Sequence, residues 1–299
     1  MRLAIVTNKE LHHKYFAAQL HEQFDVQLIL HPTGKSSSGF KAIKEKKFFF
    51  YGWFWALLKF KSLIYNKLSS KSMTKTLQKN ERIFFKEANE KYNDIPKEKI
   101  LNVFTVNSEI AINKLKEKNI DIVCFLGGDI AKKDFIDAAK VCSLNYHSGI
   151  SPYYNGTKTT FHAVKDFRPN FAGGTLMYIT ERIDGGGILS HYLPEITPDD
   201  NAATLFMKGI QGAVKVYTDF LNYIKSNELP NGVTQLRSFK FVRNIDWTII
   251  DDIKLNQFRK KKLIRIYKRN EEIINYYDLN NNDLDELYKR SLSQILKKK

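Results

Sequence analysis

The stretch Ile120-Asp121-Ile122-Val123-Cys124-Phe125-Leu126 is a continuous apolar run that only Asp121 interrupts. Such a run is typical of a strand covered on both faces, as in the middle of a parallel sheet. Upstream, the short apolar runs Leu3–Val6 and Val26–Leu30 flank residues 10–23, whose apolar side chains have helical spacing. The chain therefore opens with strand, helix and strand, and this alternation predicts an open α/β sheet.

The alternation continues through the middle of the chain. Further strands are predicted for residues 101–106 and 138–144, and helices for residues 107–118 and 197–225. The turn Pro230-Asn231-Gly232 then predicts a boundary between a main domain, 1–230, and a small C-terminal α+β module, 231–299. Within this module we expect β-like pieces at residues 239–242, 263–267 and 273–277.

Residues 33–100 interrupt the alternation and predict a helical insertion, because connections in such sheets normally need only a few residues. Residues 48–58 of the insertion form an unbroken, aromatic-rich apolar run of eleven residues, against the ~20 that a membrane-spanning helix needs. Two interpretations stay open for residues 48–65. The helix packs on the main domain, or its aromatic face lies in a membrane interface or makes a homo-oligomeric subunit contact.

Composition limits the class of protein. The 299 residues are 43% apolar and 27% charged, as in an ordinary globular protein. Two cysteines, both in apolar contexts, exclude a disulfide-stapled secreted fold, and the short apolar opening does not suit a signal peptide. We therefore expect a cytoplasmic protein.

The net charge of +16 is unevenly distributed along the chain. It resides in residues 35–100 and 237–299, whereas residues 101–236 are nearly balanced. This surplus is compatible with a phosphate-bearing partner or an acidic membrane surface, or simply with solvated helix surface.

The chemistry-bearing segment begins Asn145-Tyr146-His147-Ser148-Gly149-Ile150-Ser151-Pro152-Tyr153-Tyr154-Asn155-Gly156. Asn145 and His147 are two residues apart, so at a strand end their side chains point to the same face. Downstream, Asp184 lies in the turn Ile183-Asp184-Gly185-Gly186-Gly187, whose glycines let it approach closely. An amide donor, an imidazole and a carboxylate together suit acyl transfer to an amine. Each motif alone is more often structural than catalytic.

In this order and spacing, the motifs resemble the 10-formyltetrahydrofolate-dependent formyltransferase family, most closely its sugar N-formyltransferases. The family pattern Asn-x-His-x-Ser-x-x-Pro-x-x-x-Gly matches residues 145–156 with one substitution, and Asp-x-Gly-x-Ile matches residues 184–188. Residues 173–176 resemble the family's Gly-Val-Thr strand. The resemblance covers residues 101–225 and implies the Rossmann-like sheet of the formyltransferase type.

The resemblance also implies roles for individual residues. It makes Asn145, His147 and Asp184 catalytic, with no metal. It implies that the pterin of 10-formyltetrahydrofolate is held at Phe125, Gly127, Gly128, Asp129 and Ile130, where family members use backbone groups, and at Ile183. It places Pro152, Tyr153, Tyr154 and Gly156 against the acceptor, where the two tyrosine rings could stack on a base or cover a sugar.

The chain departs from the family pattern at three positions. Gly149 stands where serine is common, Asn155 where arginine often precedes the glycine, and Ala131 where proline is frequent. No catalytic group is lost by these substitutions. The missing arginine weakens the transfer of substrate specificity from the family.

The resemblance implies an N-formyltransferase whose acceptor is an amino sugar, and it favours a nucleotide-linked one, for surface polysaccharide such as lipopolysaccharide O-antigen. The alternatives are the initiator methionyl-tRNA formyltransferase and an enzyme for another small amine. Against the tRNA enzyme, residues 5–10 lack its Gly-Thr-Pro-x-Phe start, and the C-terminal module is short for its tRNA-binding barrel. A non-catalytic nucleic-acid or membrane-binding protein is disfavoured, because Asn145, His147 and Asp184 are all present.

Overall fold

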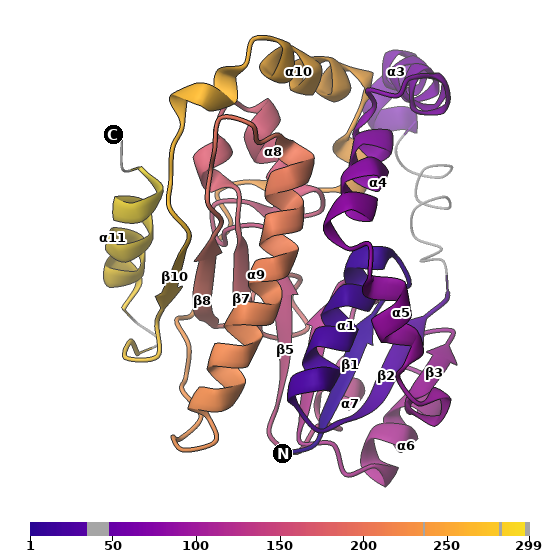
Figure 1. The fold of residues 1–299 in the computed structure, drawn as a ribbon, viewed down its shortest axis with the longest axis vertical. Coiled ribbons are helices and arrows are strands. Elements are labelled where there is room, and N and C mark those ends of the chain that lie inside the picture. Colours follow the sequence, from indigo (N-terminus) through magenta and orange to yellow (C-terminus); the bar gives the residue numbers. More distant parts are fainter. Residues whose placement is uncertain (35–47, 236, 281–282, 297–299) are drawn as a thin grey trace.

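The computed structural model describes residues 1–34, 48–235, 237–280 and 283–296, and its centre is an eight-stranded sheet (Figure 1). In spatial order the strands are β10 (Glu272–Asn275), β8 (Ile188–Leu193), β7 (Gly174–Tyr178), β5 (Cys142–His147), β4 (Ile122–Leu126), β1 (Leu3–Thr7), β2 (Val26–Pro32) and β3 (Ile100–Val103). A separate two-stranded sheet pairs β6 (Asn155–Gly156) with β9 (Phe241–Val242).

Helices cover both faces of the sheet and one end of it. They are α1 (Leu11–Gln23), α3 (Phe48–Leu68), α4 (Met73–Phe84), α5 (Ala88–Asn93), α6 (Glu109–Glu117), α7 (Lys133–Ile136), α8 (Thr159–Lys165), α9 (Ala202–Tyr223), α10 (Ile249–Lys260) and α11 (Leu284–Ile295). Short 3₁₀ helices are η2 (Lys97–Lys99), η3 (Pro169–Phe171), η4 (Asn244–Asp246) and η5 (Leu263–Ile266).

The sheet is parallel on one side and antiparallel on the other. Strands β3, β2, β1, β4 and β5 run parallel, and β7, β8 and β10 each run antiparallel to the preceding neighbour in the sheet. The predicted α/β class with a Rossmann-like sheet is therefore confirmed. The carboxyl ends of β1, β4 and β5 meet at one edge, the usual location of ligand sites in open α/β sheets.

Alternating side chains of the parallel strands feed two cores. Leu3 and Ile5 of β1 pack with α1, α5 and α9, while Ala4 and Val6 pack with α6 and α7 on the opposite face. All five residues of β4 are buried, as its continuous apolar run predicts. The result is a helix–sheet–helix arrangement in which the loops at the strand ends are free to carry chemistry.

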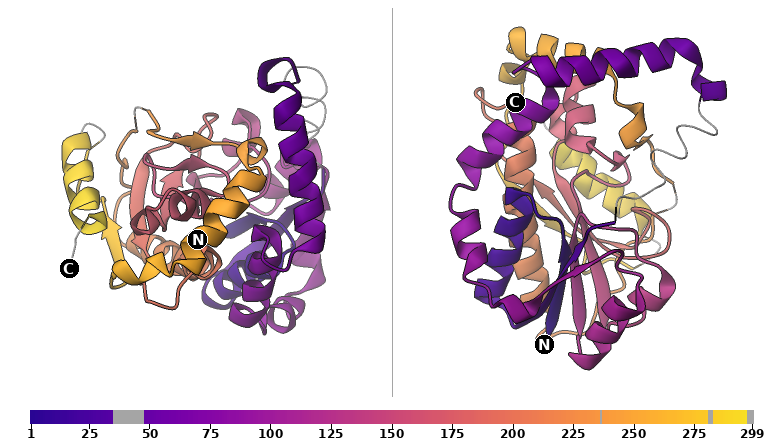
Figure 2. Two further views of the ribbon diagram at one scale, coloured as in Figure 1. Left: turned by 90° about the horizontal axis from the view of Figure 1, so that it is seen from above. Right: turned by 90° about the vertical axis from the view of Figure 1, so that its right-hand side faces the viewer.

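The predicted insertion holds α3, α4 and α5 between β2 and β3. Helices α3 and α10 contact each other beyond the carboxyl ends of the parallel strands (Figures 1 and 2). Gly52, with φ of 66°, breaks the regular course of α3. No helix in the described part of the chain combines the length and apolar character needed to cross a membrane.

The C-terminal segment joins the main sheet. β10 pairs antiparallel with β8, and α11 packs its buried Leu287 and Ile295 against Ile150 and Tyr153. The strand predicted at 263–267 is wrong, because this stretch forms the 3₁₀ helix η5. The strand predicted at 138–144 begins only at Cys142. The boundary at residues 230–232 stays a prediction.

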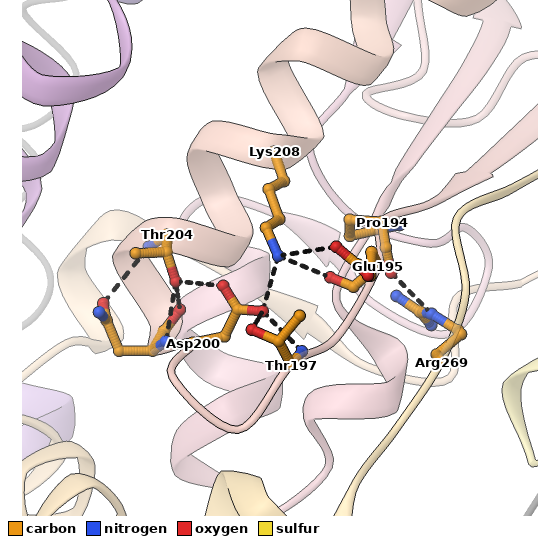
Figure 3. Close-up of polar contacts among 8 residues, drawn as sticks. Pro194, Glu195, Thr197, Asp200, Thr204, Lys208 and Arg269 are labelled. Atoms are coloured by element: carbon orange, nitrogen blue, oxygen red, sulfur yellow. Dashed lines mark hydrogen bonds and ion pairs between the residues drawn. The ribbon is translucent and has the colours of Figure 1, made fainter.

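A polar network joins the beginning of α9 to the end of β8 (Figure 3). Asp200 accepts hydrogen bonds from Thr204 Oγ1 at 2.8 Å and from Lys208 Nζ at 2.7 Å. Nearby, Arg269 Nε donates to the carbonyl of Pro194 at 2.9 Å. The network fixes the connection between the sheet and the long helix that supports it.

Candidate active site

Asn145 and His147 lie at the carboxyl end of β5, between β4 and β7. Asn145 is paired with Phe125 of β4 and Met177 of β7, and His147 with Thr175 of β7. His147 is 6% exposed, whereas Asn145 is half-buried. Strand alternation puts both side chains on one face, as the spacing of two predicts.

The imidazole of His147 is held between a carbonyl and a carboxylate. Its Nε2 lies 3.0 Å from the carbonyl oxygen of Tyr154, and its Nδ1 lies 3.4 Å from Oδ1 of Asp184. A carbonyl can only accept, so Nε2 carries a hydrogen in this arrangement. In the neutral ring Nδ1 then holds the lone pair, and the Asp184 carboxylate stabilises the cation formed when Nδ1 takes a proton.

Asp184 is fixed by the loop that follows the first motif. Its Oδ2 accepts from the backbone N–H of Gly156 at 2.8 Å, and its carbonyl accepts from Asn155 Nδ2 at 3.1 Å. Asp184 itself has φ of 48°, a left-handed conformation that is uncommon outside glycine. The two motifs, separate in the sequence, are thus joined by direct hydrogen bonds.

Gly149 makes room for the imidazole. A Cβ on this residue would stand 2.5 Å from Nε2 of His147, 2.5 Å from the carbonyl oxygen of Tyr154 and 2.7 Å from Thr159 Oγ1. The glycine, a departure from the family pattern, therefore matches this position of the ring. Any larger residue requires His147 or the loop to move.

The residues assigned to the pterin differ in what they offer. Gly127 and Gly128, with φ of 71° and 95°, turn the chain after β4. Within the described residues, the backbone N–H groups of Gly128 and Asp129 have no hydrogen-bond partner, so this turn presents free donors. Ile130 and Ile183 are 57% and 48% exposed and could cover a planar ring. These features fit a pterin.

Phe125 does not offer its side chain. It is 3% exposed and packs in the core, where its ring meets Phe135 edge-on. Its carbonyl accepts from Tyr217 Oη at 2.8 Å. Burial of β4 on both faces is the reason, and Phe125 supports the turn from below.

The two tyrosines assigned to the acceptor are buried. Tyr153 is 7% exposed, stacks on Phe239 and is hydrogen-bonded to Ser291. Tyr154 is 3% exposed, and its hydroxyl donates to Asp166 at 3.2 Å. Stacking of these rings on a ligand does not fit this packing. What Tyr154 gives to the site is its carbonyl, which orients His147.

Pro152 and Gly156 shape the loop. The Ser151–Pro152 peptide bond is cis. Gly156 has φ of 100°, and a Cβ there would stand 1.9 Å from the carbonyl oxygen of Val242. Pairing of β6 with β9 thus requires a glycine at residue 156.

A cavity of about 250 Å³ lies elsewhere, between the start of α9 and α10. Lys71, Arg259 and Arg265 are among the residues that line it. Neither Asn145, His147 nor Asp184 lines this cavity. We place the candidate site at the strand ends, because the groups able to carry out acyl transfer converge there.

The sequence patterns did not predict that Lys158, Lys59 and Trp247 lie together beside the site. Lys158, two residues after Gly156, meets Lys59 of α3 and Trp247 of the C-terminal segment. Lys59 and Trp247 are 188 residues apart in the sequence. No local signal could bring them together.

The family model described as formyl transferase matches residues 62–221, more than half of the chain, and includes Asn145, His147 and Asp184. The match begins within the predicted insertion, so part of that region is shared with the family.

Curated relatives match a shorter stretch. Methionyl-tRNA formyltransferase of Listeria monocytogenes serovar 1/2a is 29% identical over 139 residues, and that of Lysinibacillus sphaericus is 28% identical over 139 residues. In each case the match covers 44% of this chain and 44% of the relative. The chain thus spans less than half the length of these relatives.

Solved structures share the fold. A 4-N formyltransferase from Francisella tularensis has a TM-score of 0.51 at 15% identity, covering 82% of this chain and 77% of that one. A sugar N-formyltransferase from Shewanella sp FDAARGOS_354 has a TM-score of 0.51 at 14% identity, covering 86% and 87%. With the matched family model and the predicted motifs inside it, these findings confirm the resemblance: the chain belongs to the formyl transferase family.

Proposed function

We propose that this protein transfers a formyl group from 10-formyltetrahydrofolate to the amine of a nucleotide-linked amino sugar used in surface polysaccharide synthesis. The observation that carries the proposal is the contact of His147 with Asp184 next to Asn145, at the carboxyl edge of the sheet. An amide, an imidazole and a carboxylate at one place supply the groups that acyl transfer to an amine needs.

Each of the three side chains has a role. The acceptor nitrogen attacks the formyl carbon, and His147 takes the proton that the nitrogen loses. Asp184 stabilises the resulting imidazolium, and the Asn145 amide donates to the oxygen that becomes negative. When the bond from the formyl carbon to the folate nitrogen breaks, the imidazolium returns a proton to that nitrogen. The products are a formamide and tetrahydrofolate. The co-substrate supplies an already activated formyl carbon.

The choice of acceptor rests on two supports. The fold neighbours with TM-scores of 0.51 include a protein described as a sugar N-formyltransferase. The basic surplus outside residues 101–236 suits a phosphate-bearing acceptor. The second candidate is methionyl-tRNA formyltransferase. It is supported by the curated relatives, which carry that name and match this chain over 139 residues.

Product analysis of an acceptor panel separates these candidates. The enzyme is incubated with 10-formyltetrahydrofolate and with nucleotide-linked amino sugars, the free amino sugars, or methionyl-tRNA. We expect mass spectrometry to show one added formyl group on a nucleotide-linked sugar and slow reaction of its free counterpart. Formylation of methionyl-tRNA alone would replace the acceptor and keep the class of reaction.

Ionic strength should affect binding rather than chemistry. Raising salt is expected to increase KM for the acceptor and hardly change kcat, because screening weakens attraction between the phosphates and basic groups. Initial rates at several salt concentrations measure both constants. An equal KM at low and high salt would contradict a charge-bound acceptor.

Gly149 tests the close packing around His147. Gly149→Ala should lower kcat by about a hundredfold, because the added Cβ displaces the imidazole and misplacement by about 1 Å costs that much. Gly209→Ala is the matched control, since the nearest atom outside its own helix backbone, the carbonyl oxygen of Gly173, lies 3.9 Å from the added Cβ. Turnover and melting temperature are compared. Unchanged turnover in a folded Gly149→Ala would contradict the role of this packing.

Helix α3 carries the remaining proposal, contact with an anionic membrane surface or a second subunit. Its large apolar side chains Trp53, Phe54, Leu57, Phe60, Leu63, Ile64 and Leu68 are exposed. Flotation with anionic liposomes at low salt should carry wild-type protein upward and leave Trp53→Ser/Leu63→Ser behind, or light scattering should show an oligomer that the double variant loses. If the wild-type protein is a monomer and does not float with the liposomes, both the membrane contact and the subunit contact are wrong.

A further inference from the structure

Lys158 holds an unusual position next to the candidate active site. It precedes α8 and has φ of 56°, a left-handed conformation that costs an ordinary side chain energy. A Cβ on Gly149 would stand 2.7 Å from Oγ1 of the next residue, Thr159, and 2.5 Å from Nε2 of His147, so both groups lie close to Gly149. Such backbone strain persists only where surrounding contacts hold the residue in place, and it is common at ligand sites.

The Lys158 side chain lies over an indole, beside a second lysine. Its Nζ is 5.6 Å from the centre of the Trp247 ring. Lys59 Nζ of α3 donates a hydrogen bond to the backbone carbonyl of the same tryptophan, and it lies 5.6 Å from the ring centre of Trp55. Two ammonium groups, one following the catalytic motif and one from the insertion, thus flank Trp247.

In the described part of the chain, the ammonium group of Lys158 forms no ion pair. Asp252 accepts from the backbone N–H of Met73 at 2.9 Å and from the indole of Trp247 at 3.0 Å. Asp251 accepts from Thr248 and lies 3.2 Å from Lys165 Nζ. Both carboxylates are therefore engaged elsewhere.

Burial first, and then the charge of Lys59, lower the pKa of Lys158 to about 8, against the opposing effect of Asp252 and Asp251. A cation that is partly desolvated, close to another cation and without a bound carboxylate is stabilised by an incoming anion. Lys158 is the residue immediately before α8, a helix that contacts α10, and α10 in turn contacts α3.

We propose that Lys158 and Lys59 bind the diphosphate of the acceptor, so that the insertion helix α3 forms part of the acceptor site. The inference rests on the proposed function for the identity of the acceptor. It gives the insertion a place in substrate binding, in addition to any contact that its exposed apolar face makes. Trp247 contacts both ammonium groups, that of Lys158 through its ring and that of Lys59 through its backbone carbonyl.

Calorimetric titration with inorganic pyrophosphate and with uridine diphosphate tests the site without turnover. At pH 7, Lys158→Gln is expected to weaken binding about tenfold or more, as loss of a charge-assisted hydrogen bond does. Lys61→Gln, an exposed lysine two residues from Lys59 on α3 and so on another side of the helix, should bind like wild type. Equal affinity of wild type and Lys158→Gln would overturn the proposal.

A pH series adds a second readout. Since the pKa of Lys158 is about 8, wild-type affinity should fall as the pH rises from 7 to about 9, beyond the change due to the ligand's own titration. Lys158→Arg keeps its charge over this range and should lose that extra dependence while it still binds. The same extra dependence in Lys158→Arg would assign the titration to another group and overturn the role of Lys158.

Steady-state kinetics distinguish a failure of the diphosphate site from a failure of the proposed formyltransferase function. On a nucleotide-linked acceptor, Lys158→Gln should raise KM about tenfold and leave kcat near wild type, because the lost interaction contributes to binding rather than to chemistry. If Lys158→Gln turns over that acceptor with an unchanged KM, the diphosphate site is wrong and the proposed function is unaffected. If diphosphate binding depends on Lys158 but no nucleotide-linked sugar is formylated, the proposed function is wrong and the diphosphate site is retained.

Discussion

His147→Ala is expected to lower kcat by at least about a hundredfold, within the ~10²–10⁴ usual for general acid–base catalysis. The alanine removes the lone pair on Nδ1 that faces Asp184 and the N–H that binds the Tyr154 carbonyl. Asp184→Asn should have an effect of similar size. Its amide can still accept from Gly156 N–H, so the loss is that of the charge beside the imidazole.

Matched controls separate chemistry from folding. His21→Ala changes a histidine at the far end of α1, and Asp219→Asn changes an exposed aspartate on α9. Both should retain wild-type kcat. Turnover is measured beside the melting temperature of each variant. Near-normal kcat in folded His147→Ala would remove the histidine from the mechanism.

Asn145→Ala is expected to lower kcat by ~10²–10³, the range measured when one oxyanion donor is deleted. In the described part of the chain its side chain has no hydrogen-bond partner, so the substitution should leave internal contacts intact. Asn113→Ala, on the exposed side of α6, is the control. An effect on KM with unchanged kcat would move Asn145 from oxyanion stabilisation to substrate binding.

Local patterns predicted most of the parallel half of the fold. β1 and β2 follow from short apolar runs and α1 from helical spacing, and β4 follows from a continuous apolar run that suits burial on both faces. The helix after Ser108 also follows from local chemistry, because the serine side chain accepts from the backbone N–H of Ala111. Ile110 on the same helix is 67% exposed, so apolar character alone does not determine which of its residues are buried.

Long-range contacts explain what the sequence did not predict. The pairing of β10 with β8 joins segments about 80 residues apart and has no local signal, as is usual for non-local strand pairs. Residues 263–266 have the β-branched and apolar composition of a strand, yet they form a 3₁₀ helix that buries Ile264. Propensity does not distinguish the two when tertiary packing decides.

The candidate site likewise combines features that local spacing predicts with features that depend on long-range contacts. Asn145 and His147 share a face because they are two apart in one strand, which spacing predicts. The approach of Asp184 depends on hydrogen bonds to Asn155 and Gly156, and burial of Tyr153 depends on Phe239 and Ser291 from the C-terminal segment. Contacts of this second kind become visible only in three dimensions.

The most direct test of formyl transfer follows the formyl carbon itself. The enzyme is mixed with 10-formyltetrahydrofolate labelled with an isotope in the formyl group, together with a nucleotide-linked amino sugar, and the label is traced by nuclear magnetic resonance. We expect the label to appear as an N-formyl group on the sugar nitrogen with wild-type enzyme, and at a rate at least about a hundredfold lower with His147→Ala. A label that stays on the folate with every amine offered, or that transfers equally fast with His147→Ala, would contradict this expectation.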